Sequence, residues 1–185
     1  MKTPAPAVIP CTKRHLREIR DILNDAILHT TAIYEDTPRT PEQVAAWFAH
    51  KQEKKLPVLG IETADGALAG FATYGPFRPH HGFRHTVEHS VYVTQAHRGQ
   101  GIGHALLRAL IDAAQARQFH VMIGVIDAAN AASIRFHRSF GFTPCGTLRQ
   151  AGFKFGRRLD VEFHQLLLTE GQPPDVSAGL TPFKM

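Results

Sequence analysis

The sequence has few cysteines, no long apolar run and no dense block of one charge, and each shortage excludes a class of protein. Cys11 and Cys145 are the only cysteines, too few for a disulfide framework or a cysteine metal site, and no His, Cys or Asp spacing indicates metal ligands. No stretch approaches the roughly 18 uncharged apolar residues of a membrane span. The first residues lack the apolar stretch of about 7–15 residues of a signal peptide. We therefore expect a cytoplasmic protein without a metal site or a membrane partner.

The composition is that of a globular domain with a modest positive charge. Of 185 residues, 43% are apolar and 20% are charged, a balance that excludes bulk disorder. The formal net charge is +5 with histidine neutral, yet no run of five or more Lys or Arg occurs. Spread charge of this kind argues against a nucleic-acid-binding arm and favours a small ligand that carries phosphate.

Periodicity and turn signals predict alternating helices and strands. Thr40-Pro41-Glu42-Gln43 combines an N-cap, a proline at the first helical position and a capping-box glutamine. Asp65-Gly66 is a strong hairpin signal between two apolar runs. We expect helices from Thr12, from Pro41, and over 102–117 and 130–140, and strands over 57–63, 67–74, 85–93, 119–126, 143–148 and 159–168.

This order predicts one mixed α/β domain. The domain is expected over residues 8–170, after a flexible leader of residues 1–7 and before an irregular tail of residues 171–185. Its second half contains a strand, a glycine-rich turn and a helix, an arrangement that recurs at phosphate sites because the first amides of a helix have no partner within it.

The turn is Arg98-Gly99-Gln100-Gly101-Ile102-Gly103, after the strand that ends at Val93. Glycines at alternating positions let the backbone approach a ligand closely, and Arg98 can add a charge-assisted bond to a pyrophosphate. The spacing is neither Gly-x-Gly-x-x-Gly nor a P-loop. Taken alone, the turn favours a ligand site, and the alternative is an ordinary glycine-rich connection.

Its surroundings favour the ligand site. Arg98, Gly101 and Gly103 resemble the acetyl-CoA loop of the GNAT N-acetyltransferases, and Asn130 resembles the residue that opens their next helix. Residues 74–78, 82–93 and 152–157 resemble longer strings of the phosphinothricin and methionine sulfoximine/sulfone N-acetyltransferase branch. The resemblance implies a mostly antiparallel central sheet flanked by helices, acetyl-CoA as co-substrate, an amino-acid acceptor and a homodimer.

The resemblance also implies positions for the ligands. Cofactor contacts are expected at Val91, Tyr92, Val93, Arg98, Gly99, Gln100, Gly101, Ile102, Gly103, His104, Asn130 and Ser139. Substrate contacts are expected at Arg78, Pro79, His80, Arg84, Glu88, His89 and Ser90. A backbone N–H near Val93 would stabilise charge on the thioester oxygen.

Two side chains are candidates for proton transfer. Glu88 lies in the middle of a strand, where desolvation raises a carboxyl pKa and suits a base that deprotonates the amine; the alternative is a salt bridge to Arg78 or Arg84. His137 could protonate the departing thiolate of CoA, or merely hydrogen-bond the cofactor. His89 faces the opposite side of its strand from Glu88, which is more typical of a structural histidine.

The acceptor is expected to be a free amino acid. The guanidinium of Arg78 could bind its carboxylate with two parallel bonds. Tyr34, Phe77 and Arg158 stand where this branch or its close members have tryptophan, near the expected acceptor pocket. Two other functions stay open, namely acetylation of a peptide N-terminus or a polyamine, and CoA binding without catalysis.

Overall fold

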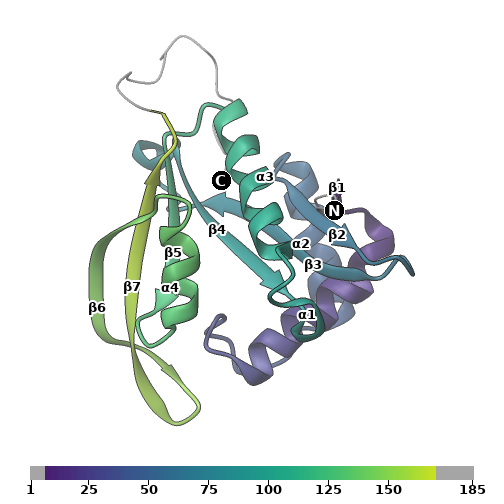
Figure 1. Ribbon diagram of the computed structural model, residues 1–185, viewed down its shortest axis with the longest axis horizontal. Helices are drawn as coiled ribbons and strands as arrows, with labels where there is room; N and C mark the ends of the chain where they lie inside the picture. Colours follow the sequence, from purple (N-terminus) through teal and green to yellow (C-terminus); the bar gives the residue numbers. More distant parts are fainter. Residues whose placement is uncertain (1–6, 170–185) are drawn as a thin grey trace.

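Seven strands form one sheet in the computed structural model, which describes residues 7–169 (Figure 1). The order across the sheet is β1-β2-β3-β4-β5-β7-β6. The neighbours β4 and β5 are parallel, and all other neighbours are antiparallel, as expected. The strands are β1 (Val8–Pro10), β2 (Val58–Glu62), β3 (Leu68–Pro76), β4 (Thr86–Val93), β5 (Val121–Asp127), β6 (Thr143–Lys154) and β7 (Arg157–Leu167).

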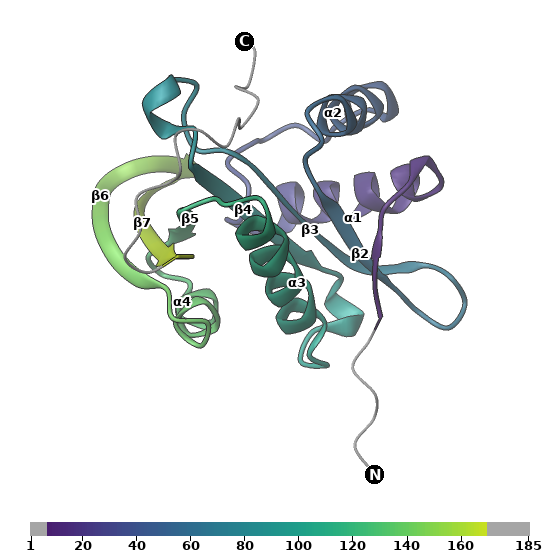
Figure 2. The same cartoon turned by 90° about the horizontal axis from the view of Figure 1, so that it is seen from above.

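Helices cover both faces of this sheet (Figure 2). The helices α1 (Leu16–His29) and α2 (Pro41–Glu53) pack on one face, and α3 (Ile102–Ala116) and α4 (Ala131–Arg138) pack on the other. Each face has its own buried apolar cluster, because the side chains of a strand alternate between the two faces. Among the described residues, no helix is long and apolar enough to cross a membrane.

Local sequence signals set most element boundaries. Thr40 caps α2, and its hydroxyl and the Gln43 side chain form the expected capping box. Gly66 turns the β2–β3 hairpin with φ of +82°. The helix expected from Thr12 begins with one 3-10 turn, Lys13–His15, before α1. Residues 1–6 and the tail 171–185 lie outside the described residues, so the leader and the tail stay predictions.

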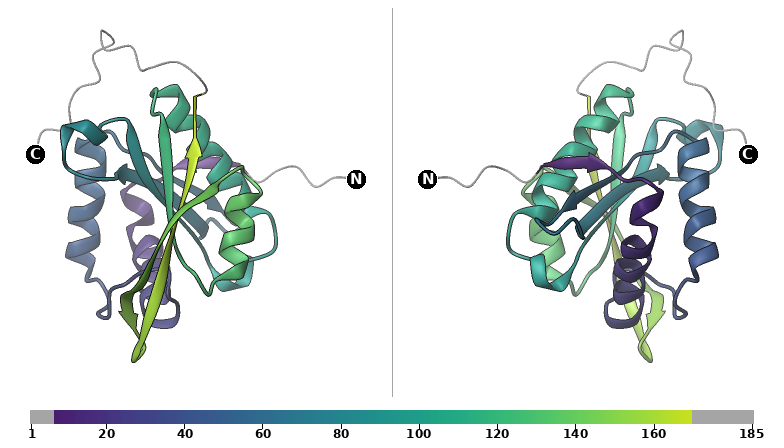
Figure 3. Two further views of the ribbon diagram at one scale, coloured as in Figure 1. Left: turned by 90° about the vertical axis from the view of Figure 1, so that its left-hand side faces the viewer. Right: turned by 90° about the vertical axis from the view of Figure 1, so that its right-hand side faces the viewer.

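Two strand predictions were incomplete. The strand β1 was missed because it has three residues and ends at Pro10, which leaves no periodicity to detect. The strand β6 was expected to end at Leu148 but runs to Lys154, because the pairing with β7 resumes after an irregularity between Leu148 and Gly152. The resulting hairpin forms one end of the sheet, and its turn projects beyond the helices (Figure 3).

The pairing between β4 and β5 stops halfway along both strands. Only Thr86–Glu88 pair with Val121–Ile123, although β4 continues to Val93 and β5 to Asp127. Beyond this point the two strands separate, and the edge of β4 that faces β5 has no strand partner. A gap therefore opens in the middle of the sheet, with backbone amides and carbonyls available to a ligand.

Candidate active site

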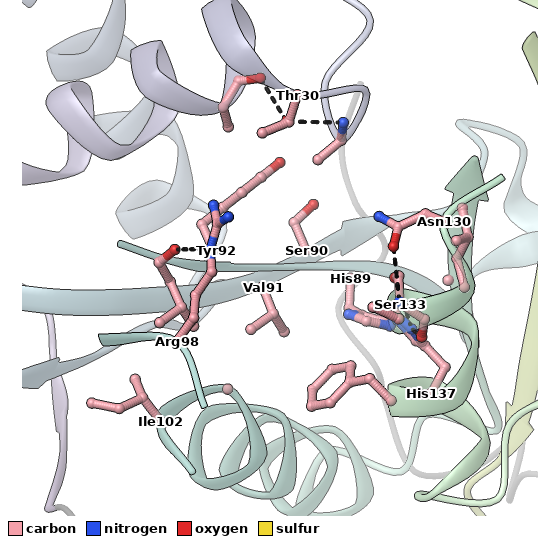
Figure 4. Close-up of a pocket in the computed structure, with 18 of the residues that line it drawn as sticks. Thr30, His89, Ser90, Val91, Tyr92, Arg98, Ile102, Asn130, Ser133 and His137 are labelled. Atoms are coloured by element: carbon pink, nitrogen blue, oxygen red, sulfur yellow. Dashed lines mark hydrogen bonds between the residues drawn. The ribbon is translucent and has the colours of Figure 1, made fainter. Parts of the chain in front are cut away.

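A cavity of about 600 Å³ occupies this gap. It runs from the face covered by α1 to the face covered by α3 and α4 (Figure 4). On one side it is lined by Ile22, Asp25, Ala26, Thr30, Thr31, Ala32, Ser90 and Tyr92. On the other side it is lined by His89, Val91, Val93, His97, Arg98, Gly99, Gly101, Ile102, Gly103, His104, Asn130, Ala132, Ser133, Phe136 and His137, and β5 contributes Gly124–Asp127.

The glycine turn before α3 has the geometry of an anion site. Gly99 and Gly101 have φ of +76° and +79°, a left-handed conformation that L side chains rarely adopt. Gly101 is the N-cap of α3, so the following amides face the cavity end without helical partners. No acidic residue lies in the first turn of α3. The helix dipole and the Arg98 guanidinium, which donates to the Val93 carbonyl at 3.3 Å, both favour a pyrophosphate here.

Most of the expected cofactor residues meet around this end of the cavity. Asn130 caps α4, accepting from the Ser133 amide at 3.0 Å, and it also lines the cavity. The His104 ring stacks on Phe140 with a centroid distance of 4.2 Å. Gln100 and Ser139 do not line the cavity; their side chains donate instead to the carbonyls of Ala96 and Phe136.

His137 presents a bare ring nitrogen to the cavity. Its Nδ1 lies 2.7 Å from the Ser133 carbonyl oxygen, which can only accept, so Nδ1 carries the hydrogen. Burial lowers the pKa of His137; the Ser133 carbonyl raises it and His164 lowers it further. The ring is therefore neutral near pH 7, and Nε2 is a proton acceptor. A role as proton donor requires that Nε2 first receives a proton.

Glu88 lies on the opposite face of the sheet, where β4 and β5 separate. Burial raises the pKa of Glu88, and the nearby Arg78 guanidinium partly opposes this. Among residues 7–169, Glu88 forms no salt bridge to Arg78 or Arg84. The Glu88 side chain does not line the large cavity; Ser90, two residues further on the same face, does.

The side of the cavity toward α1, called the chamber below, is rich in hydroxyl groups. The Tyr92 side chain extends toward Thr30, and the Ser90 hydroxyl points the same way (Figure 4). Burial raises the pKa of Tyr92, so its phenol stays protonated and can donate a hydrogen bond. The Thr30 hydroxyl donates to the Ala26 carbonyl at 2.7 Å and accepts from the Ala32 amide.

Three contacts hold the loop between α1 and α2 against this chamber. The Thr31 hydroxyl donates to the Asp127 carboxylate at 2.6 Å. The buried Lys154 ammonium, from the β6–β7 hairpin, donates to the Ile33 carbonyl at 2.5 Å. A Cβ at Gly152 would lie 2.5 Å from the Tyr34 ring, so only glycine permits this approach. The hairpin therefore helps to fix the part of the chamber wall that this loop forms.

Several expected substrate residues lie apart from the cavity. Arg78, Pro79 and His80 are exposed on the loop after β3, where the Arg78 guanidinium lies 4.1 Å from the Phe77 ring centroid. The Arg84 guanidinium is 3.4 Å from the His81 carbonyl oxygen. By contrast, His89 and Ser90 both line the cavity.

None of the three residues expected at tryptophan positions of the branch lines the main cavity; they are Tyr34, Phe77 and Arg158. Tyr34 packs at Gly152, and Phe77 meets Phe83 edge to face with a centroid distance of 5.7 Å. Arg158 lines a second hollow near the hairpin, which shares Asp127 with the main cavity.

The sequence interpretation missed Asp127 and Gly124 as parts of the cavity. Gly124 interrupts a buried apolar strand, and a glycine there often marks a place where another group approaches closely. Asp127 is the last residue of the same strand and is 7% exposed. Thr30 and Thr31, which also line the cavity, belong to a string, residues 30–34, that resembles the same N-acetyltransferase branch.

Comparison with known proteins agrees with this geometry. The model of the acetyltransferase (GNAT) family matches residues 16–142. The L-methionine sulfoximine/L-methionine sulfone acetyltransferase of Salmonella typhimurium is 46% identical over 157 residues, 85% of this chain and 91% of that protein. The L-amino acid N-acyltransferase MnaT of Escherichia coli is 43% identical over 157 residues, with the same two coverages.

A solved structure with bound ligand is similar over nearly the whole chain. The GNAT superfamily phosphinothricin acetyltransferase of Sinorhizobium meliloti, in complex with AcCoA, has a TM-score of 0.90 and 34% identity, covering 96% of each chain. The glycine turn, the α3 N-terminus and the divided sheet are all present to receive acetyl-CoA. The chain therefore belongs to the GNAT acetyltransferase family and is an acetyl-CoA-dependent N-acetyltransferase.

Proposed function

We propose that the protein acetylates the α-amino group of a small free amino acid of the methionine sulfone or sulfoximine type, and phosphinothricin less well. One observation carries this proposal: the end of the cavity at Ser90 and Thr30 is lined by hydroxyl groups, and the loop after α1, which forms part of its wall, is held by hydrogen bonds to Asp127 and Lys154. Sulfone, sulfoximine and phosphinate oxygens could accept hydrogen bonds from the Ser90 and Tyr92 hydroxyls, because the Thr30 and Thr31 hydroxyls already donate within the protein. The relative at 46% identity is named for methionine sulfoximine and methionine sulfone, and the relative at 43% identity is named for L-amino acids.

The proposal assigns the two ends of the cavity to the two substrates. The turn at Gly99–Gly101, the start of α3 and Arg98 would hold the phosphates of acetyl-CoA, which supplies the activated acetyl group. The unpaired edge of β4 from Val91 to Val93 would offer its amides to the thioester oxygen. The amine would then enter from the chamber at Ser90 and Thr30.

Proton acceptors stand on both sides of the gap. Glu88 would take the proton of an incoming ammonium through Ser90 or a water, since its own side chain does not reach the cavity wall. His137 Nε2 would take the proton released as the C–N bond forms, and it would return that proton to the departing sulfur. The amine attacks directly, without an acyl-enzyme.

A carboxylate on the acceptor needs a cation. Arg78 lies close enough to Glu88 to lower its pKa, so it is the candidate at this end of the site. Its guanidinium would have to leave the Phe77 ring to bind the carboxylate with two parallel bonds.

We also propose that the protein is a homodimer in the cytoplasm. The strand β6 is the last in the sheet, and Leu148, Phe153 and Phe155 are 53%, 62% and 55% exposed on its hairpin. An open edge strand with exposed apolar side chains favours a protein partner, and a second copy would cover it. Analytical ultracentrifugation of the wild type and of Phe153→Lys tests this; a wild-type monomer would contradict it.

An acceptor screen tests the main proposal. Release of CoA thiol is measured with methionine sulfone, methionine sulfoximine, phosphinothricin, common amino acids and short peptides. We expect the sulfone and sulfoximine to have the highest kcat/KM. Faster acetylation of peptides with free N-termini than of every free amino acid would favour the peptide alternative.

A further inference from the structure

A buried lysine outside the cavity holds the loop between α1 and α2, residues 30–40. Lys154 is the last residue of β6, at the tip of the β6–β7 hairpin. Its ammonium donates a hydrogen bond of 2.5 Å to the carbonyl of Ile33, which lies 121 residues earlier in the chain. Lys154 is 1% exposed and does not line the cavity, whereas residues 30–32 do. Lys154 therefore contacts the loop and not a ligand in the cavity.

The hairpin turn fixes the place of this ammonium. Phe155 and Gly156, the two residues between β6 and β7, have φ of +52° and +72°, and a type I′ turn requires positive φ at both positions. Lys154 and Arg157 are register partners on either side of the turn. The strand β7 also pairs with β5 along Val121–Asp127, so the hairpin is anchored in the central sheet.

A buried ammonium needs polar partners, and for Lys154 the loop supplies them. Lysine is almost never fully buried unless it is paired. Burial lowers the pKa of Lys154, and the carboxylates of Asp36 and Glu35 partly oppose this. These carboxylates and the Ile33 carbonyl belong to four successive residues of the loop. Removing the ammonium would leave the Ile33 carbonyl without this hydrogen bond and take a favourable charge away from both carboxylates.

Two side-chain hydrogen bonds connect the loop to the sheet. The Thr31 hydroxyl donates to the Asp127 carboxylate at the end of β5, and Lys154 donates to the Ile33 carbonyl. Each bond involves one charged group, and such bonds are roughly twice as strong as bonds between neutral groups. The Lys154 bond is therefore a large part of what holds this loop against the sheet.

We propose that Lys154 is a positioning residue for the acceptor, because its ammonium holds residues 30–36 in the conformation that forms part of the chamber wall. The loop is then ordered before the acceptor arrives, so acceptor binding does not have to supply the free energy that orders it. Arg98 and Gly99–Gly101, at the other end of the cavity, belong to other elements. The inference rests on the proposed function, since it takes residues 30–32 to face the acceptor.

Three substitutions test this role. Lys154→Met keeps an unbranched apolar side chain but removes the donor and the charge. Lys154→Gln keeps a neutral donor, so its effects should have the same direction and be smaller. Lys51→Met is the matched control, because the buried Lys51 ammonium also donates to a backbone carbonyl, that of Tyr74 at 2.8 Å, but connects α2 to β3.

Amide hydrogen exchange of the free enzyme measures the loop without any substrate. The Thr30 and Ala32 amides are hydrogen-bonded, and we expect their exchange in Lys154→Met to be about 10- to 100-fold faster, the value of one charged hydrogen bond. A peptide covering residues 98–106, at the start of α3, should exchange as in the wild type. Lys51→Met should leave the loop unchanged. Wild-type exchange of the loop in Lys154→Met would overturn the inference.

Acceptor kinetics provide the second readout. In Lys154→Met we expect kcat/KM for the acceptor to fall by about 10- to 100-fold, with the Kd for acetyl-CoA nearly unchanged. Methionine sulfone and its carboxamide should lose the same factor, since Lys154 touches neither. Lys51→Met should change neither constant. An unchanged acceptor kcat/KM despite faster loop exchange, or an equal loss of acetyl-CoA affinity, would overturn the positioning role.

The test stays decisive in two other cases. If Lys154→Met does not fold, Lys154→Gln is measured in its place, and wild-type values in both readouts would overturn the inference. If the acceptor screen identifies a peptide or a polyamine, the proposed function fails. The loop exchange and the kcat/KM for that acceptor then still test Lys154, so the two proposals fail separately.

Discussion

Replacing Gly101 by alanine should weaken acetyl-CoA binding without unfolding the protein. Gly101 has φ of +79°, and a Cβ added there meets no atom within 4 Å, so the cost is conformational rather than steric. An L residue in this left-handed conformation costs about 1–2 kcal/mol. In the free variant the turn can relax to another conformation, but acetyl-CoA binds only the original one. Returning the turn to that conformation therefore reduces the binding free energy by this amount, which corresponds to a Kd that is roughly 5- to 30-fold higher.

Gly66 offers a matched control. It has φ of +82° in the β2–β3 hairpin, also with no atom within 4 Å of a built Cβ, and it does not line the cavity. Gly66→Ala should therefore lower stability without changing the Kd for acetyl-CoA. Gly101→Asn should retain more affinity than Gly101→Ala, since asparagine tolerates this conformation better. Calorimetry and urea unfolding measure both quantities. A Kd within twofold of the wild type in folded Gly101→Ala would refute the reasoning.

Three further predictions concern titrating groups. Glu88→Gln should lower kcat near pH 7 by about 10²–10⁴-fold, and the loss should be smaller at high pH, where the amine is already neutral. A small loss of kcat that does not depend on pH would instead indicate that Glu88 has a structural role. Arg78→Ala should raise the Glu88 pKa further and move the acidic limb of the kcat/KM profile to higher pH, because Arg78 now lowers that pKa; an unmoved limb contradicts this. Burial lowers the Lys51 pKa from 10.5 to about 8. Between these two pH values Lys51 is protonated in the unfolded chain and neutral in the folded protein, so the free energy of unfolding rises with pH in this range. At pH 7 the burial of the charged Lys51 ammonium therefore costs about 3 kcal/mol of stability, and Lys51→Met should remove that cost while losing about 1 kcal/mol with the hydrogen bond to the Tyr74 carbonyl. Urea unfolding should therefore show that Lys51→Met stabilises the protein near pH 7 and no longer stabilises it near pH 10.5.

The sequence predicts the fold well where local signals are strong. The capping box at Thr40, the Asp65-Gly66 turn and the alternation of β4 each depend on neighbouring residues, and the structure confirms all three. The strand β1 and the second half of β6 depend on pairing with distant strands. Their composition carries too little periodicity to reveal them.

The candidate site also contains parts that local motifs predict and parts that depend on contacts between distant residues. The glycine turn and Asn130 follow from motifs, and they line the cavity. The proposed acceptor chamber is made by contacts across the chain, such as Thr31 with Asp127 and Lys154 with Ile33, and no spacing in the sequence encodes them. The protonated nitrogen of His137 was equally hidden, because it depends on which carbonyl the ring meets after folding.

The most direct test of the central claim is product analysis by mass spectrometry. Purified protein is incubated with acetyl-CoA and equal concentrations of L-methionine sulfone and its carboxamide. The account predicts one acetyl group on the α-nitrogen, with the free acid preferred by roughly 10- to 100-fold, the value of a charged hydrogen bond of about 1.5–3 kcal/mol. Equal labelling of acid and amide would contradict the carboxylate site. No acetylated product from either would contradict acetyl transfer to a small amino acid in the β4–β5 gap.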